Sequence, residues 1–223
     1  MNINADFATR AAVHADEAPW VASPMKGVDR RMLDRMGDEV ARATSIVRYA
    51  PGSAFSAHTH TGGEEYLVLD GVFQDEHGDF PVGTYVRNPP TSSHTPSSAP
   101  GATIFVKLWQ FDMEDRRQVT IDTFGETPRP VAEGLSEIPL FEDSRERVRI
   151  EVWAPSAEIT QQHKGFEALV LSGSFTEGGE TFGPNSWLRL PVGTPLKAVA
   201  GSEGARLWVK SDHLDEPQTP PNP

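Results

Sequence analysis

An internal repeat of about a hundred residues constrains the fold of this chain more than any other feature of its sequence. The segment YLVLDGVFQDEHGDFPVGTYVRNPPTSSH aligns without a gap with the later segment ALVLSGSFTEGGETFGPNSWLRLPVGTPL. The matched pairs are Gly71 with Gly173, Phe73 with Phe175, Phe80 with Phe182, Tyr85 with Trp187, Arg87 with Arg189 and Pro89 with Pro191. A unit of this length is too long for a solenoid repeat, so the sequence predicts two domains of one fold.

Short runs rich in β-branched and aromatic residues dominate the chain, and Gly and Pro separate them. Examples are EEYLVLDGVF, GATIFVKLWQF and RVRIEVWAPSAEI. The chain has 19 Gly and 19 Pro, which leave little room for long helices. Many short strands with turns between them predict an all-β sandwich, jelly roll or barrel. The best helical candidate is RRMLDRMGDEVARA, which carries Gly37 in its interior.

The predicted domain boundary falls in the polar segment DRRQVTIDTFGETPRPVAEG, where Pro and Gly are frequent. We therefore expect a first domain with its leading segment over residues 1–115 and a second domain over 116–214. Residues 215–223 form a polar, Pro-rich tail that we expect to be disordered.

Composition excludes several classes of function. With 20 Lys and Arg against 32 Asp and Glu, the net charge is −12, which disfavours direct binding to nucleic acid or to an anionic membrane surface. Cys is absent, which excludes disulfides, thiolate zinc sites, iron–sulfur clusters and a Cys nucleophile. The N-terminus lacks the pattern of a signal peptide, and no apolar run is long enough to span a membrane, so we expect a cytoplasmic protein.

Two of the seven histidines, His58 and His60, stand one residue apart. On a β-strand they share one face, and Glu64 has the same parity after a Thr-Gly-Gly turn. His94 follows one hairpin later, and if the sheet closes on itself these four side chains converge inside it. Three imidazoles and a carboxylate suit Zn, Fe(II), Mn, Ni or Cu(II), with coordination positions left open. The alternative interpretation is a polar loop that happens to contain histidines.

This segment resembles the cupin superfamily. The first cupin motif is a glycine, five residues, His-x-His, three or four residues, a glutamate, six residues and a glycine. The residues that fit it are Gly52, His58, His60, Glu64 and Gly71. In the second motif Gly83, Pro89 and His94 fit, whereas Thr91 replaces a glycine and Ser98 an asparagine. The two replacements bear on turn geometry rather than on the ligand set.

The sequence around both motifs is similar to that of the cupin domain of ChrR, a zinc-binding anti-sigma factor. The resemblance implies a double-stranded β-helix, here as two cupin domains in tandem, with one divalent metal per chain on the four ligands. It implies zinc ahead of Fe(II) or Mn, a sensory or regulatory role, a small-molecule ligand in the N-terminal barrel and a homodimer. ChrR holds its sigma factor through a helical domain with His and Cys ligands. With no Cys, and only His14 in the first forty residues, we expect that module to be missing.

An enzymatic alternative stays open, because related cupins are dioxygenases that cleave diketones or hydroxyacetophenones with bound iron. In that case Fe(II) would occupy the same four ligands, and the chain offers no independent general base among its motif residues. No catalytic residue is therefore assigned. Tyr66 shares the face of the ligands, and it either lines the pocket or belongs to the core with its hydroxyl satisfied.

The second half departs from the metal-binding pattern. In the gapless alignment His58, His60, Glu64 and His94 correspond to Thr160, Gln162, Phe166 and Leu196, none of which is a competent transition-metal ligand. His163 has the wrong parity unless a bulge shifts the strand. We therefore expect no metal in the second domain, and we expect His14 and His213, near the termini, to be exposed.

Overall fold

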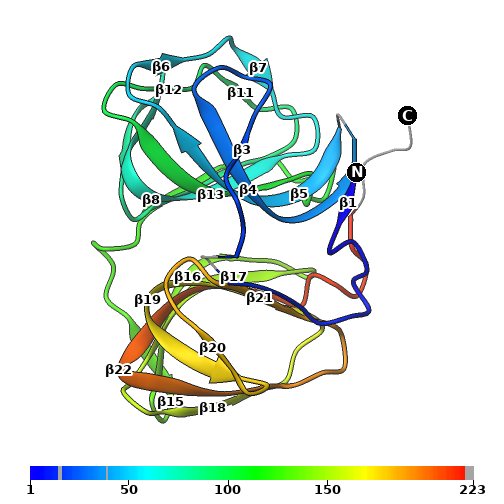
Figure 1. Ribbon diagram of the computed structural model, residues 1–223, viewed down its shortest axis with the longest axis vertical. Coiled ribbons are helices and arrows are strands. Elements are labelled where there is room, and N and C mark those ends of the chain that lie inside the picture. Colours follow the sequence, from blue (N-terminus) through cyan, green and yellow to red (C-terminus); the bar gives the residue numbers. More distant parts are fainter. Residues whose placement is uncertain (15–16, 39, 219–223) are drawn as a thin grey trace. The chain divides into compact units, whose positions relative to one another are not determined.

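A computed structural model describes residues 1–14, 17–38 and 40–218, and every regular element in these residues is a β-strand (Figure 1). The prediction of an all-β fold is therefore confirmed. No helix of the length and apolar character needed to cross a membrane occurs among the described residues. Residues 219–223 of the predicted tail lie outside the described part of the chain.

The chain divides into two compact units. The first contains Met1–Ala5 and Pro19–Phe124, and the second contains Asp6–Ala18 and Gly125–Pro217. This division differs from the predicted ranges in two places, because each of two edge strands pairs with the unit to which the predicted ranges do not assign it. Strand β14 (Val119–Asp122) pairs with the first unit, and β2 (Ala11–Val13) pairs with the second.

In the first unit the main sheet has the order β1-β4-β5-β13-β8-β10-β14, and β7 and β11 form a separate two-stranded sheet. Strands β3, β6, β9 and β12 pair at its margins. The remaining bounds are β1 Asn2–Ile3, β3 Val21–Ala22, β4 Val28–Gly37, β5 Ala41–Tyr49, β6 Ser53–Ala54, β7 His58–Thr59, β8 Glu64–Asp75, β9 Gly78–Pro81, β10 Thr84–Asn88, β11 Ser93–His94, β12 Ser97–Ser98 and β13 Ala102–Leu108.

In the second unit the sheet has the order β15-β16-β17-β22-β19-β21-β2, with β18 on β22 and β20 on β19. The bounds are β15 Arg129–Ala132, β16 Leu135–Glu142, β17 Arg147–Trp153, β18 Glu158–Gln161, β19 Phe166–Glu177, β20 Glu180–Phe182, β21 Trp187–Leu190 and β22 Leu196–Ser211. Strands β16, β17, β22, β19 and β21 thus repeat the order of β4, β5, β13, β8 and β10.

The matched glycines of the repeat have matched conformations. Gly71 and Gly173 have φ angles of 70° and 71°, in the left-handed region that favours glycine. A Cβ on Gly71 would collide with the carbonyl oxygen of Gly101, and a Cβ on Gly173 would collide with that of Gly204. In each unit the glycine therefore lets two backbones approach closely.

The helical candidate is wrong, because residues 30–37 of it lie in strand β4 and residues 41–43 lie in strand β5. Leu33 is buried and β5 is buried from Ala41 to Val47, so packing on the sheet overrides the helix propensity of Arg, Met and Leu. Gly37, with φ of 114°, ends β4.

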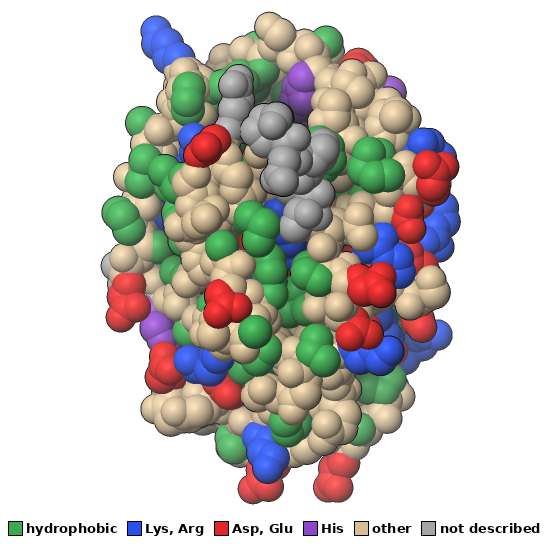
Figure 2. Space-filling view, turned by 90° about the vertical axis from the view of Figure 1, so that its right-hand side faces the viewer, with side chains coloured by type: hydrophobic (Ala, Val, Ile, Leu, Met, Phe, Trp, Pro, Cys, Tyr) green, Lys and Arg blue, Asp and Glu red, His purple; other side chains and the backbone are tan. Residues whose placement is uncertain are grey.

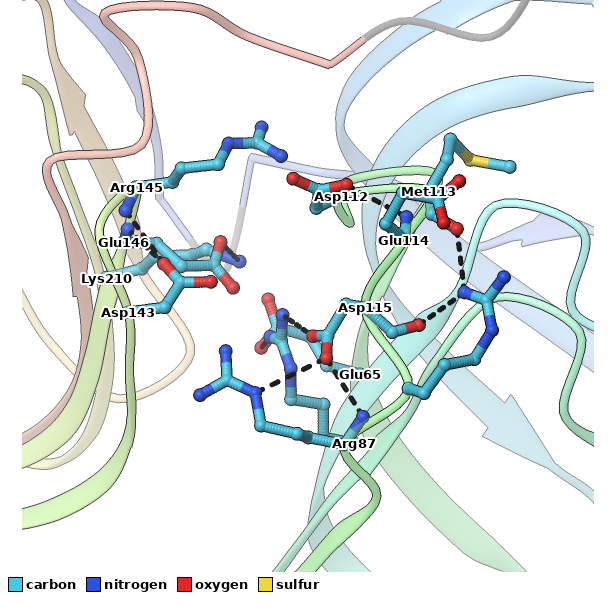
Figure 3. A network of polar contacts seen from close by, with 12 residues as sticks. Glu65, Arg87, Asp112, Met113, Glu114, Asp115, Asp143, Arg145, Glu146 and Lys210 are labelled. Atoms are coloured by element: carbon cyan, nitrogen blue, oxygen red, sulfur yellow. Dashed lines mark hydrogen bonds and ion pairs between the residues drawn. The ribbon is translucent and has the colours of Figure 1, made fainter.

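The first unit has an apolar core and a face with buried charges. The core contains Val28, Val47, Tyr66, Val68, Phe73, Val86, Ala102, Ile104 and Val106. On the other face of β8 and β10, Arg87 lies between Glu65, at 3.4 Å, and Asp115, at 3.2 Å (Figure 3). Each of these charged side chains is at most 4% exposed, and each has an oppositely charged partner.

Candidate metal centre

Three histidines of the first unit come together at the ends of short strands. His94 of β11 lies directly opposite His58 of β7, and His60 follows one residue after β7 ends. The ring centroids are 5.0 Å apart for His58 and His60, 4.9 Å for His58 and His94, and 4.6 Å for His60 and His94. One nitrogen of each ring lies within 4.8 Å of the others, so the group could hold a metal ion.

Glu64, the first residue of β8, directs its carboxylate toward this group. Its Oε2 is 3.2 Å from Nε2 of His60 and 3.8 Å from Nε2 of His94. Asn88 on the neighbouring strand donates from Nδ2 to the same oxygen at 3.3 Å. The structure thus brings together the four residues that the sequence proposes as ligands.

The other nitrogen of each ring has a partner outside the group. His60 Nδ1 is 3.1 Å from Ser92 Oγ, whose own hydrogen goes to the carbonyl of Pro89 at 2.6 Å. Ser92 therefore accepts, and His60 carries its proton on Nδ1. His94 Nδ1 is 3.1 Å from Asp75 Oδ2, which can only accept when ionised. Both histidines are left with the Nε2 lone pair that a metal would use.

Burial tunes the protonation of the site. It lowers the pKa of His60 to about 4, and the charge of His58 adds to the effect. Burial also lowers the pKa of His94, although Glu64 and Asp75 act in the opposite direction. The buried imidazoles are therefore neutral at pH 7, the form that ligates metals. Burial raises the pKa of Glu64, against the effect of His94 and Asn88.

The donor set fits a divalent metal. Nε2 of His60 is buried and has no hydrogen-bond partner, which is costly unless something else occupies that lone pair. A metal on His58, His60, His94 and Glu64 would satisfy it and would offset the burial of the carboxylate. His58 is exposed whereas the other three are buried, so the site meets solvent on the His58 side.

The outer partners Asp75, Ser92 and Asn88 are residues that sequence reasoning missed. Motif spacing identifies ligands because they recur at fixed intervals. An outer partner depends instead on which loop packs behind each imidazole, and the sequence carries no separate signal for that.

The second unit does not rebuild this group, but its register differs from the gapless alignment. Gln161 lies opposite Leu196, as His58 lies opposite His94. Two residues after Gln161 comes His163, as His60 comes two residues after His58. Strand pairing thus places His163, not Gln162, at the position that corresponds to His60. This pairing is shifted by one residue from the gapless alignment, so the parity of His163 in the sequence no longer rules it out. Of the four ligand positions only this one holds a histidine.

Polar side chains fill the interior of the second unit around Gln161. Its Nε2 donates to Glu151 at 3.0 and 3.1 Å, and Arg149 pairs with Glu151 at 2.6 Å. Trp153 Nε1 donates to the same carboxylate at 2.7 Å. Nearby, a cavity of about 530 Å³ is lined by Gln162, His163, Lys164, Asp212 and residues 142–147. Both ring nitrogens of His163 are buried without a hydrogen-bond partner.

The expectation that the two terminal histidines are exposed is wrong. His213 is 9% exposed, and its Nε2 lies 3.1 Å from Glu167. His14 is half-buried, stacks on Phe182 at 4.8 Å and lies 3.0 Å from Glu180. Both residues adjoin strands that pair in the second unit, which explains why both histidines are packed.

Comparison with known proteins finds a family model that matches part of the chain. A family model described as "ChrR Cupin-like domain" matches residues 8–112. A search of curated proteins finds no match to this chain.

Several solved structures resemble the chain. One, from Nostoc punctiforme and provisionally described as a dioxygenase, has a TM-score of 0.79 and 14% identity over 93% of this chain and 84% of that chain. The bacterial pirin YhhW from Escherichia coli, in complex with nickel(II), has a TM-score of 0.66 and 12% identity, over 91% of this chain and 98% of that chain. A mutant of the Bacillus subtilis oxalate decarboxylase OxdC has a TM-score of 0.63 and 12% identity, over 92% and 77%.

At these identities the solved structures show the fold alone, which is the all-β cupin fold. The family model adds a relationship in sequence for the part of the chain that carries His58, His60, Glu64 and His94. Residues 8–112 thus match the model of the ChrR cupin-like family.

Proposed function

We propose that this chain is a metal-binding, ChrR-like double cupin with a sensory or regulatory role. One divalent ion, zinc in the first place, is held by His58, His60, His94 and Glu64 in the first unit. The observation that carries the proposal is that Nε2 of His60 is buried without a hydrogen bond and faces the Glu64 carboxylate, while Nδ1 of His60 and Nδ1 of His94 are already engaged. When bound, the metal supplies a Lewis acid with coordination positions left open for a small molecule.

The surroundings of the site favour binding of a ligand rather than its catalytic conversion. Asp75 is bonded to His94, Ser92 to His60 and Asn88 to Glu64. Each polar side chain described here as contacting the four ligands is thus committed to orienting one of them. A general base must point at the reacting atom, whereas these contacts turn Asp75, Ser92 and Asn88 toward the proposed ligands.

The partners we propose are a small molecule in the first unit and a second copy of the chain. With a net charge of −12, direct contact with nucleic acid is not part of the proposal. On the face drawn in Figure 2, Lys and Arg side chains lie among Asp and Glu side chains. A sigma factor would have to bind a surface other than a Cys-containing module, because the chain has no Cys. We place the protein in the cytoplasm.

An Fe(II)-dependent dioxygenase acting on a small diketone or hydroxyacetophenone is the second candidate. The observation that favours it is the aromatic wall beside the ligands, where the Phe73 ring lies 6.0 Å from His94 and 5.0 Å from Tyr66. Such a wall suits an apolar organic substrate. The similar structure from Nostoc punctiforme, provisionally described as a dioxygenase, is consistent with it.

Elemental analysis of the protein, purified without chelator or added metal, tests both candidates. We expect one zinc ion per chain, which would support the sensory role. One iron or manganese ion per chain would favour the dioxygenase, to be followed by oxygen-consumption assays with diketones. A metal-free protein that also takes up no added zinc, iron or manganese would contradict both, and two ions per chain would contradict the assignment of the second unit.

A further inference from the structure

The hydroxyl of Tyr66 is a buried polar group with no hydrogen-bond partner. The residue is 1% exposed, and its ring packs against Phe73 at 5.0 Å and Phe80 at 6.3 Å. A tyrosine in such an apolar layer ordinarily keeps its hydroxyl bonded, because leaving it unpaired costs free energy. The sequence left open whether this hydroxyl is satisfied within the core, and the structure gives it no partner there.

The position of Tyr66 connects this hydroxyl to the metal centre. Tyr66 follows Glu64 by two residues on β8, so both side chains lie on the interior face of the strand. Phe73 contacts both Tyr66 and His94, with centroid distances of 5.0 Å and 6.0 Å. The phenol is therefore in the layer of side chains next to the four proposed ligands.

Two comparisons within the chain separate Tyr66 from an ordinary core residue. Tyr85, whose side chain is also fully buried, donates its hydroxyl to Glu65 at 2.7 Å on the opposite face. In the second unit Glu167 and Trp187 reproduce that structural bond at 2.8 Å. At the position of Tyr66, however, the second unit has Ala168. The phenol is thus present in the unit that has the ligand set and absent from the unit that lacks it.

We infer that the Tyr66 hydroxyl donates a hydrogen bond to a small anion held at the metal centre. The inference rests on the proposed function, since it requires a metal on the four ligands. A neutral phenol in an apolar layer is a donor that favours a ligand with a charged acceptor atom, such as a carboxylate, an oxyanion or azide. The residue would then select anionic over neutral small molecules for the site.

The experiment uses the full chain loaded with Co(II), whose visible absorption reports its coordination, and azide as the probe. Wild type and Tyr66→Phe should take up one cobalt ion with equal affinity. The azide Kd should rise about 10-fold or more in Tyr66→Phe, as expected for the loss of a hydrogen bond to a charged group. A Tyr85→Phe variant, altered on the opposite face, should keep the wild-type azide Kd.

Denaturation of the metal-free proteins provides a second measurement. Because the hydroxyl has no partner, Tyr66→Phe should unfold at the same or a higher denaturant concentration than wild type. A clearly lower midpoint would show that the protein itself satisfies the hydroxyl, and this would overturn the inference. Equal azide affinity in wild type and Tyr66→Phe, with cobalt bound in both, would overturn it while leaving the proposed function intact. Failure of wild type to bind cobalt would overturn both.

Discussion

Asp75 Oδ2 lies 3.1 Å from Nδ1 of His94, and the Asp75 side chain is only 4% exposed. Asp75 is the last residue of β8 and Glu64 is the first. One strand therefore provides a proposed ligand at one end and the partner of another ligand at its other end. The register shift of β8 against β13 and the left-handed Gly71 lie between them. A bend in the strand is thus part of how the site is built.

Asp75→Asn should weaken metal binding without unfolding the protein. An amide accepts less strongly than a carboxylate and leaves His94 less firmly oriented, so we expect the metal affinity to fall about 10- to 100-fold. Competition with a chromophoric chelator measures this. Asp70→Asn, an exposed change on the same strand, is the control and should keep the wild-type affinity. Equal affinities for Asp75→Asn and Asp70→Asn would show that Asp75 does not support the site.

His94→Ala and His58→Ala should each remove the metal, whereas His163→Ala should retain it. The first two substitutions delete members of the histidine group, and the third alters a histidine that belongs to no group of three or more possible ligands in the described part of the second unit. Metal content of the three purified variants, measured side by side, checks the expectation. Full metal occupancy in His94→Ala would exclude this set of ligands.

Thr91→Gly should stabilise the first unit. Thr91 has φ of 76°, a left-handed conformation that is strained for a β-branched residue, and it stands where the cupin motif has glycine. We expect a gain of about 1 kcal/mol in the free energy of unfolding, after the greater backbone entropy of glycine is subtracted. Urea denaturation measures it. Gly193, with φ of 83° in the second unit, offers the reverse test, since Gly193→Thr should be destabilising.

The two glycines of the first motif should tolerate alanine differently. Gly52 and Gly71 have φ of 76° and 70°, but a Cβ on Gly52 meets nothing within 4 Å. Gly52→Ala should therefore cost only the left-handed strain, about 1 kcal/mol. Gly71→Ala should cost several times more, because its Cβ would collide with the Gly101 carbonyl. Similar denaturation midpoints for the two variants would contradict this difference.

His163→Phe should make stability less sensitive to acid. Burial lowers the pKa of His163, the nearby Arg149 adds to this, and Asp212 opposes it. The unfolded chain takes up a proton near pH 6.5 while the folded chain does so only at lower pH, so wild-type stability falls as the pH drops below about 6.5. The variant should gain on wild type between about pH 7.5 and about pH 5.5 in denaturation experiments. A constant difference across this range would contradict the expectation.

The sequence predicts much of this structure because the repeat, the strand patterns and the spacing of the motif residues can be recognised directly in it. Strand content follows from short β-rich runs, and the convergence of His58, His60, Glu64 and His94 follows from their spacing. The register of the second unit could not be predicted. The segment between Gln161 and β19 is shorter than the segment between His58 and β8, which moves His163 to the position of His60, but the gapless alignment does not show this change. The sequence predicts a helix over residues 30–43 because these residues have high helix propensity. That propensity is a smaller effect than the burial of a whole strand. Likewise, nothing local marks Asp75 as the partner of His94.

Strand β2 pairs with β21 in the second unit, although Pro19–Phe124 of the first unit lie between them in the chain. Translation therefore delivers this edge strand early and its partner late. Until residues 187–190 leave the ribosome, the segment around Ala11–Val13 has no sheet to join, and afterwards it closes the edge through a connection of high contact order. A variant in which residues 6–18 are moved to follow residue 217 would bring the two strands closer in sequence, and should speed their pairing.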